Sequence, residues 1–205
     1  MDVVMVALLG VAIYLVGSVP TAYILVRLAK GVDLREAGSK NVGALNTYHE
    51  VGAWAGLLVV VVDSAKGALA VAVPIWAGAP DWALYITTPL VVVGHNWPVF
   101  LGFRGGKGAA AILGMSLALV PWLTLTALLA AAIVALLLRN VVLGAAFGFV
   151  LLNTLLVVTG QGPPTLAICL LLTVLVTATY LFAIREHVAA SVRTRRWRHL
   201  FQGMV

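Results

Sequence analysis

Two short polar segments stand out because they gather the residue types that bind anions. The first combines two glycines with a hydroxyl, an ammonium group and two amides, in the order Gly38-Ser39-Lys40-Asn41-Val42-Gly43-Ala44-Leu45-Asn46. The glycines let the backbone approach a ligand closely, and the side chains supply hydrogen bonds. This set suits an anionic ligand that carries hydroxyl groups, although a solvated loop rich in turn residues has a similar composition.

The second segment, Arg104-Gly105-Gly106-Lys107-Gly108, runs directly into an apolar stretch that we predict to be helical. Free backbone N–H groups, the positive end of a helix and two cations would converge there, so we predict a phosphate site. It is not a Walker A loop, which would need glycine at Leu101 and Ser or Thr at Gly108. The alternative is a glycine-rich turn whose charges mark the cytoplasmic side.

Charged and polar residues also occur inside the apolar stretches. Asp63 and Lys66 lie three residues apart, so on a helix they share a face and can form an ion pair. A charge inside a bilayer is costly, which makes this pair a candidate functional site as well as a structural one. His95 and Asn96 end another apolar stretch shortly before the second polar segment, and we include both among the candidate ligand contacts.

Neither a metal site nor a nucleic-acid site is predicted. The carboxylates are few and scattered, and the neighbours Glu186 and His187 would face different directions on a helix. The single cysteine, Cys169, sits among leucines and is expected to be a small apolar filler. The basic tail Arg185–Arg198, which includes Trp197, is typical of an amphipathic segment on anionic lipid headgroups.

These residues are carried by a strongly apolar chain. Of its 205 residues, 62% are hydrophobic and 10% are charged, and the mean hydropathy is +1.08. A water-soluble domain could not cover its surface with so few polar groups, so we predict an all-α integral membrane protein. The formal charge of +6 would favour nucleic acid in a soluble protein, whereas here it marks topology and anion contacts. Asp2, with no Lys or Arg before the first apolar run, favours a span over a cleaved signal peptide.

We predict a single transmembrane domain over residues 1–205 with about seven spans, the N-terminus outside and the C-terminus in the cytoplasm. A polar loop, Arg27–Glu50, follows the first span, which is expected to kink at Gly17-Ser18-Val19-Pro20. As one helix, Ala109–Leu138 would measure about 45 Å against a hydrocarbon core of about 30 Å, so we divide it at Pro121 into two short spans. Twelve of the thirteen basic residues then face the cytoplasm. The apolar runs are Val3–Val26, Val51–Trp76, Leu84–Leu101, Ala109–Leu138, Val141–Val158 and Thr165–Ile184.

Two pairs of glycines have the spacing that lets helix backbones approach closely. They are Gly52-x-x-x-Gly56 and Gly144-x-x-x-Gly148. We expect both pairs to serve helix packing.

Taken in order, five motifs resemble those of the bacterial acyl-phosphate:glycerol-3-phosphate acyltransferases, and the resemblance covers nearly the whole chain. It implies a multi-pass enzyme of the bacterial inner (plasma) membrane whose active site faces the cytoplasm. Such an enzyme moves a fatty acyl group from acyl phosphate to the first hydroxyl of glycerol 3-phosphate, giving lysophosphatidate and phosphate. No metal, nucleotide, coenzyme A or other cofactor is implied, and no protein nucleophile or base. The motifs are Gly17-Ser18-Val19-Pro20, Gly38 to Asn46, Asp63-Ser64-Ala65-Lys66-Gly67, Gly94-His95-Asn96-Trp97-Pro98-Val99-Phe100 and Phe103 to Gly108.

The resemblance also implies roles for individual residues. It assigns the phosphates of the two substrates to the first and second polar segments, and this carries over onto Ser39, Asn41, Asn46 and Lys107. We expect the catalytic residues to be Lys107, Ser39 and His49. The expected substrate-binding residues are Lys40, Asn41, Gly43, Asn46, Asp63, Lys66, His95, Asn96, Arg104, Gly105, Gly106 and Gly108.

The sequence departs from the family pattern at several positions. The family usually has Gly where Lys40 stands, Thr at Leu45 and Arg at His49. Of its Arg-Glu-Asn-Ile-Lys-Arg-Leu stretch only the start is kept, at Arg185 and Glu186, and His187 stands in place of the asparagine. We interpret Lys40 and His49 as sharing the task of the missing arginine.

Two other functions stay open at this stage. One is a diverged member of the same fold that acts on another acceptor or only binds a phospho-metabolite. The other is a small anion transporter, which the charges of Asp63 and Lys66 inside the bilayer favour. The gathering of polar motifs on one membrane side, without a recognisable inverted repeat, speaks against transport.

Overall fold

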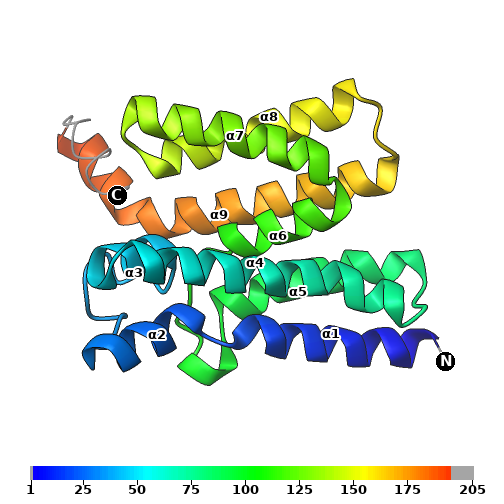
Figure 1. The fold of residues 1–205 in the computed structure, drawn as a ribbon, viewed down its shortest axis with the longest axis horizontal. Coiled ribbons are helices and arrows are strands. Elements are labelled where there is room, and N and C mark those ends of the chain that lie inside the picture. The colour runs from blue at the N-terminus through cyan, green and yellow to red at the C-terminus, as the bar shows by residue number, and fades with distance from the viewer. Residues whose placement is uncertain (1, 195–205) are drawn as a thin grey trace. The chain divides into compact units, whose positions relative to one another are not determined.

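The computed structural model describes residues 2–194, except for the side chains of residues 183, 184 and 186–194. Within this part all the regular elements are helices, which confirms the predicted all-α fold (Figure 1). In chain order they are α1 (Asp2–Ser18), α2 (Thr21–Lys30), α3 (Ala44–Val51), α4 (Ala53–Trp76), η1 (Asp81–Ala83), α5 (Leu84–Asn96), η2 (Val99–Leu101), α6 (Ala109–Leu119), α7 (Pro121–Leu138), α8 (Val141–Val158) and α9 (Pro163–Thr194).

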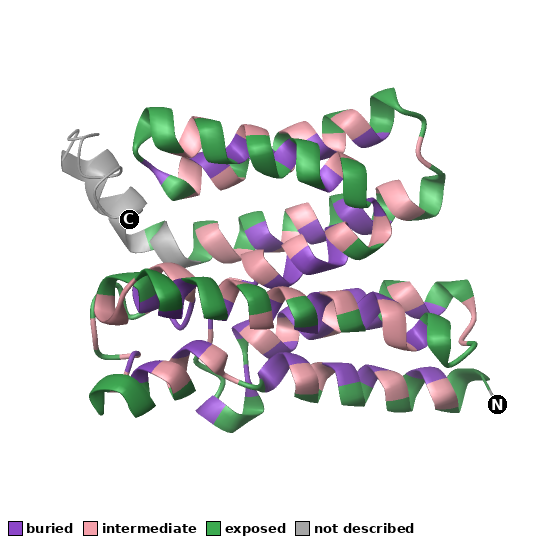
Figure 2. Cartoon of the chain, in the orientation of Figure 1, coloured by how far each residue is buried: buried purple, intermediate pink, exposed green. Residues whose placement is uncertain are grey.

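Six helical segments of the described chain are long and apolar enough to cross a membrane. Large apolar side chains such as Leu8, Leu57 and Leu136 are exposed along the helices, as expected for surfaces that face lipid (Figure 2). The seventh predicted span is α6, whose 11 residues measure about 16 Å and fall short of a full crossing. The six longer segments are Asp2–Lys30, Ala53–Trp76, Asp81–Leu101, Pro121–Leu138, Val141–Val158 and Pro163–Phe182.

Prolines set two of the helix breaks. Residues Val19 and Pro20 interrupt the first span between α1 and α2, and Pro121 stands at the first turn of α7 after Val120 has left the helical conformation. Both breaks were predicted from the sequence. The division of Ala109–Leu138 at Pro121 is confirmed. Of the two short spans expected there, α6 is shorter than a full crossing, whereas α7 has 18 residues and is long enough to cross.

The chain forms two compact units that meet in sequence at Leu119 and Val120. In the first unit α1 packs on α5, and α4 packs on α6. Glycines make both contacts close: a Cβ at Gly17 or Gly94 would collide with backbone across the α1–α5 contact, and one at Gly67 or Gly114 would do so between α4 and α6. These glycines bring the polar ends of four helices within reach of one another.

The polar loop between the first two spans is shorter than predicted. Helix α2 continues to Lys30 and α3 begins at Ala44, so the connecting segment is 31–43 rather than Arg27–Glu50. The connecting segment is held by apolar anchors, because Leu34 and Val42 are buried in a cluster with four other residues. Those four are Ala22, Val26, Val59 and Leu101. A loop with two buried aliphatic anchors can keep a fixed conformation although its other residues are polar.

In the second unit α8 packs on α7 and α9. A Cβ at Gly144 or Gly148 would press on Ala131 of α7, so the packing role predicted for this pair is confirmed. Gly56 of the other pair packs against Tyr48 of α3, whereas Gly52 links α3 to α4 with φ +125°. Cys169 is buried, as expected of an apolar filler. The amphipathic segment predicted at Arg185–Arg198 falls, beyond Arg185, outside the described side chains.

Candidate functional site

The first polar loop folds around the side chain of Asn46. This residue lies in the first turn of α3 and is 2% exposed. Its Nδ2 amide donates to the carbonyl oxygens of Ala37 and Asn41, both at 3.0 Å, and its Oδ1 accepts from the Ser39 N–H at 3.1 Å. A buried amide that closes three hydrogen bonds to one loop fixes the loop's shape.

Two residues of this loop have left-handed backbone conformations, Gly38 with φ +53° and Lys40 with φ +60°. A Cβ at Gly38 would meet Asn46 Oδ1 and would lie 2.9 Å from Glu50 Oε1, so only glycine fits there. Lys40 is exposed and carries its side chain at a backbone angle that glycine adopts more readily. The glycine that the family usually has at this position thus has a conformational reason.

The second polar loop is pinned to the end of α5. The Gly105 N–H donates to the Asn96 carbonyl at 3.1 Å, and the Gly106 N–H donates to the His95 carbonyl at 3.0 Å. The prediction of free N–H groups in this segment is therefore wrong for these two residues. The N–H groups at the start of α6 have no acceptor within the helix, because its first such bond runs from Ile112 to Gly108. A phosphate can still bind at that helix end.

The two polar loops meet at Gly106. A Cβ at this buried glycine would collide with His95 Nε2 and would lie 2.7 Å from the Val42 carbonyl oxygen of the first loop. Farther out, Arg104 Nη2 lies 3.5 Å from Glu36 Oε1, between side chains that are 64% and 63% exposed. The structure thus brings together the two segments that sequence analysis singled out separately.

Lys107 stands between this junction and the start of α6, and its residue is partly buried. Burial lowers the pKa of the Lys107 ammonium below its ordinary value, because the charged form loses hydration. A partly desolvated cation is attracted to an anion more strongly than a fully solvated one. Lys107 therefore suits a contact with a phosphate group.

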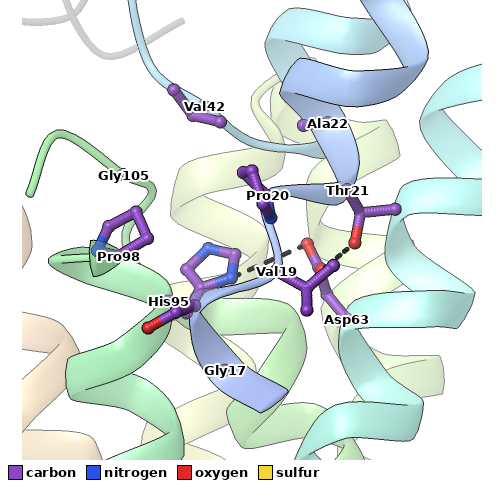
Figure 3. A pocket seen from close by; sticks show the side chains of 11 residues that line it. Gly17, Val19, Pro20, Thr21, Ala22, Val42, Asp63, His95, Pro98 and Gly105 are labelled. Carbon is purple, nitrogen blue, oxygen red and sulfur yellow. Dashed lines mark hydrogen bonds and ion pairs between the residues drawn. The ribbon is translucent and has the colours of Figure 1, made fainter. Parts of the chain in front are cut away.

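Asp63 and Lys66 form the predicted ion pair on α4, with Nζ 2.7 Å from Oδ1 (Figure 3 shows Asp63). Both side chains are buried, and the ammonium also donates to the Val19 carbonyl at 2.6 Å and to Thr21 Oγ1 at 2.5 Å. Thr21 Oγ1 in turn donates to Asp63 Oδ1 at 3.1 Å. The pair thus holds the α1–α2 break, where the proline interrupts the helical hydrogen bonds.

His95 links this buried pair to the second loop. Its Nδ1 lies 3.8 Å from Asp63 Oδ2 (Figure 3). Its Nε2 is the atom nearest to the place of a Cβ at Gly106. A small pocket lies beside the imidazole and is lined by residues of both loops and of the α1–α2 break. Its lining is Gly17, Ser18, Val19, Pro20, Thr21, Ala22, Val42, Asp63, His95, Pro98 and Gly105.

The remaining predicted residues differ in how closely they join this arrangement. His49 is exposed on α3, and its ring stands edge-on to Tyr48 with centroids 5.2 Å apart. Asn41 and Gly43 adjoin each other, since a Cβ at Gly43 would lie 2.9 Å from Asn41 Nδ2. Asn96 is buried at the end of α5, and Gly108, with φ +80°, precedes α6.

Sequence reasoning missed two polar residues that hold the arrangement together. Thr21 completes the Asp63–Lys66 network, and Arg35 joins the first loop to the segment before the second one. The spacing Asp33-x-Arg35 could have signalled an ion pair across a turn. Among the described residues, no group of three or more His, Cys, Asp and Glu side chains could hold a metal ion.

The chain was compared with known proteins. The model of the family described as glycerol-3-phosphate acyltransferase matches residues 7–192. Over 120 residues the chain is 42% identical to glycerol-3-phosphate acyltransferase 2 of Dehalococcoides mccartyi, covering 58% of this chain and 57% of that protein. Over 131 residues it is 44% identical to the glycerol-3-phosphate acyltransferase of Anaeromyxobacter sp., covering 62% and 65%. These matches span less than two thirds of the length of each relative.

A solved structure matches over a greater length. The crystal structure of PlsY (YgiH), an integral membrane glycerol 3-phosphate acyltransferase, in its glycerol 3-phosphate form has a TM-score of 0.80 and 32% sequence identity. That match covers 94% of each chain. The lysophosphatidic acid form of the same protein has a TM-score of 0.77. With a family match over most of its length, this chain belongs to the glycerol-3-phosphate acyltransferase family.

Proposed function

We propose that this protein transfers a fatty acyl group from acyl phosphate to the first hydroxyl of glycerol 3-phosphate. The hydroxyl oxygen forms a bond to the acyl carbonyl carbon, and the bond from that carbon to the phosphate oxygen breaks. Lysophosphatidate and inorganic phosphate are the products, and the hydroxyl proton passes to a phosphate group. Membership of the family supports this proposal, as do the glycerol 3-phosphate and lysophosphatidic acid forms of the similar solved structure.

The observation that carries the proposal is the junction of the two polar loops at Gly106. Acyl phosphate and glycerol 3-phosphate are both anions, so a site for their reaction must hold two phosphates side by side. Two loops rich in cations, amides and glycines that touch through a glycine backbone can provide such a site. Phosphate is a good leaving group once cations and N–H groups hold its charge, so catalysis here needs positive charge and positioning more than a base.

We assign individual roles to the predicted residues. Lys107 and Arg104 hold a phosphate group together with the start of α6, and Gly108 gives the backbone turn that precedes this helix. Ser39 and Lys40 of the first loop and His49 of α3 contact glycerol 3-phosphate from the exposed side, together with Asn41 beside Gly43.

The buried residues of the site act as its frame. Asn46 positions the first loop, because its amide hydrogen bonds are made within that loop. Asp63 and Lys66 hold the α1–α2 break, and His95 and Asn96 hold Gly105 and Gly106. Of these residues, Asp63 and His95 line the small pocket, which is where a substrate would reach them.

The distribution of basic residues supports a site that faces the cytoplasm of a bacterium. Both loops carry Lys and Arg, and such residues accumulate on the cytoplasmic side of the plasma membrane. Acyl phosphate enters from the bilayer and glycerol 3-phosphate from the cytoplasm.

The test is lysophosphatidate formation by the purified protein. Protein in nanodiscs is given palmitoyl phosphate and radiolabelled glycerol 3-phosphate, and the lipid product and the released phosphate are both measured. The two products should form in equal amounts. Palmitoyl coenzyme A serves as the donor control and should give no product. Lys107→Ala should lower the rate roughly a hundredfold or more, which corresponds to about 2–4 kcal/mol of lost transition-state stabilisation. Lys30→Ala, which removes an exposed cation at the end of α2, is the matched control.

Two results would contradict the proposal. Absence of lysophosphatidate with folded protein would favour a diverged acceptor, and normal turnover in Lys107→Ala would remove the phosphate contact. Anion transport is less well supported than it was by sequence, because the Lys66 ammonium already donates to three oxygens, two at the α1–α2 break and one on Asp63 of α4.

A further inference from the structure

The turn Asp33–Glu36 lies in the first polar loop and contacts the segment that precedes the second polar loop. Leu34 in this turn is fully buried in the cluster that includes Leu101 of η2. Asp33 Oδ1 accepts from the Arg35 N–H at 2.9 Å, which closes the turn through a side chain. The turn is therefore anchored at its centre and fixed at its start.

The Arg35 guanidinium makes three contacts, one within this turn and two to other elements. It forms a two-pronged ion pair with Asp33, with Nη2 at 2.6 Å from Oδ2 and Nε at 3.0 Å from Oδ1. Its Nη1 donates to the Leu101 carbonyl at 3.4 Å, and its Cζ lies 5.3 Å from the ring centre of Tyr23 on α2. Each contact restricts the planar group in a different direction.

The ion pair persists over a wide pH range. Hydrogen bonding by Arg35 lowers the pKa of the Asp33 carboxyl to about 2, so this carboxylate stays charged at all pH values of physiological interest. The two side chains are about one quarter exposed, so the pair adds little to global stability. Its geometry, more than its energy, gives it a role.

Leu101 is the last residue of η2 and lies three residues before Arg104, where the second polar loop begins. A side chain that holds the Leu101 carbonyl from the first loop therefore sets the distance between the two loops. Glu36 and Arg104 form a second and more exposed contact beside it. The two loops are therefore joined at their exposed edge by these two contacts and at their buried centre by Gly106.

We propose that Arg35 is a positioning residue, which holds the first polar loop against η2 and thereby aligns the two substrates for acyl transfer. This inference rests on the proposed function. Arg35 touches neither substrate, so each loop still binds its own ligand when the side chain is lost. A shift of about 1 Å between two bound reactants can lower a rate a hundredfold while leaving each affinity nearly unchanged.

The first experiment separates kcat from KM. Arg35→Gln should lower kcat about tenfold or more, with the KM of each substrate within about twofold of wild type. Arg27→Gln is the matched control, because Arg27 is an exposed arginine whose described hydrogen bond goes only to the nearby Gly31 carbonyl. A raised KM with unchanged kcat would make Arg35 a substrate contact and overturn the proposal.

A charge exchange tests whether the contact to Leu101 matters. Asp33→Arg combined with Arg35→Asp restores an ion pair, but a carboxylate at position 35 cannot donate to the Leu101 carbonyl. We expect kcat to stay low in this double variant. Recovery of kcat would show that the ion pair alone is sufficient, and the inference would be wrong.

A distance measurement gives a result that does not depend on activity. Spin labels are placed at Val32 and Phe103, two exposed residues on either side of the contact, in a Cys169→Ser background. Arg35→Gln should broaden the distance distribution, whereas Arg27→Gln should not. An unchanged distribution would refute the positioning role even if the enzyme acts on another acceptor. A broadened distribution in a protein that makes no lysophosphatidate would leave this role in place and refute only the proposed function.

Discussion

Replacing Gly106 with alanine tests the junction on which the proposed site depends. A Cβ at this position would lie 2.7 Å from the Val42 carbonyl oxygen and would also collide with the His95 ring. Ordinary van der Waals contact begins at 3.4 Å, so the two loops would have to separate by about 0.7 Å or more. Neither neighbour can yield easily, because one is backbone and the other is a ring packed beside Asp63.

The expected loss follows from that displacement. A misplacement of about 1 Å between reacting groups can cost roughly a hundredfold in rate, so kcat/KM of Gly106→Ala should fall by tenfold to a hundredfold. The overpacking itself should cost about 1–3 kcal/mol of stability. Initial rates of lysophosphatidate formation, divided by the amount of monodisperse protein, separate the two effects.

Two alanine controls isolate the steric cause. Gly102→Ala lies in the adjoining turn at φ +62° and meets no atom within 4 Å, so it reports backbone strain alone. Gly162→Ala has ordinary contact and no positive φ, so it should behave like wild type. If Gly106→Ala is as active as these controls, the two loops do not need their present spacing, and our account of the site is wrong.

Three further predictions concern charge and topology. Burial lowers the pKa of Lys107, so its positive charge should be lost at a pH below the ordinary lysine range, and acyl transfer should decline as the pH rises through that value. Lys107→Arg should move this decline to higher pH. Lys40→Gly should leave the melting temperature unchanged or higher, since it relieves a left-handed lysine, while it raises the KM for glycerol 3-phosphate; adding His49→Arg should restore much of that KM. An unchanged KM in Lys40→Gly would contradict the compensation between these residues. A cysteine at Phe103 should react with an impermeant thiol reagent from the cytoplasm and one at Gln161 from outside, and labelling of both from one side would contradict the predicted topology.

The spans could be predicted because apolar length and proline position are local signals. The sequence limits Val141–Val158 coincide with α8, and the breaks at Pro20 and Pro121 occur where expected. Helix α3 was missed since its eight residues lie within a polar stretch and their burial depends on packing against α4. Helix propensity alone does not identify so short a segment.

The partners of polar side chains were harder to predict than the residues themselves. The amides of Asn46 and the N–H groups of Gly105 and Gly106 were recognised as hydrogen-bonding groups, and both were expected to face a ligand. In the fold, Asn46 donates to carbonyl groups of the first loop, and the two glycine N–H groups donate to carbonyl groups at the end of α5. Neither set of partners can be recognised from the spacing of residues in the sequence. Sequence shows which groups can donate, whereas only tertiary structure shows which donors are already used.

This distinction bears on the departures from the family pattern. Lys40 and His49 are exposed, Leu45 is only partly buried, and the side chains of all three take no part in the described hydrogen bonds of Asn46 or in the Gly106 junction. The frame of the two loops does not depend on them, and substitutions there alter charge and contacts on the exposed side of the first loop. We therefore expect this chain to keep the loop geometry of its family and to differ in how strongly, and at which pH, it holds the acceptor phosphate. The Lys40→Gly and His49→Arg variants measure that difference directly, since neither change reaches the buried frame.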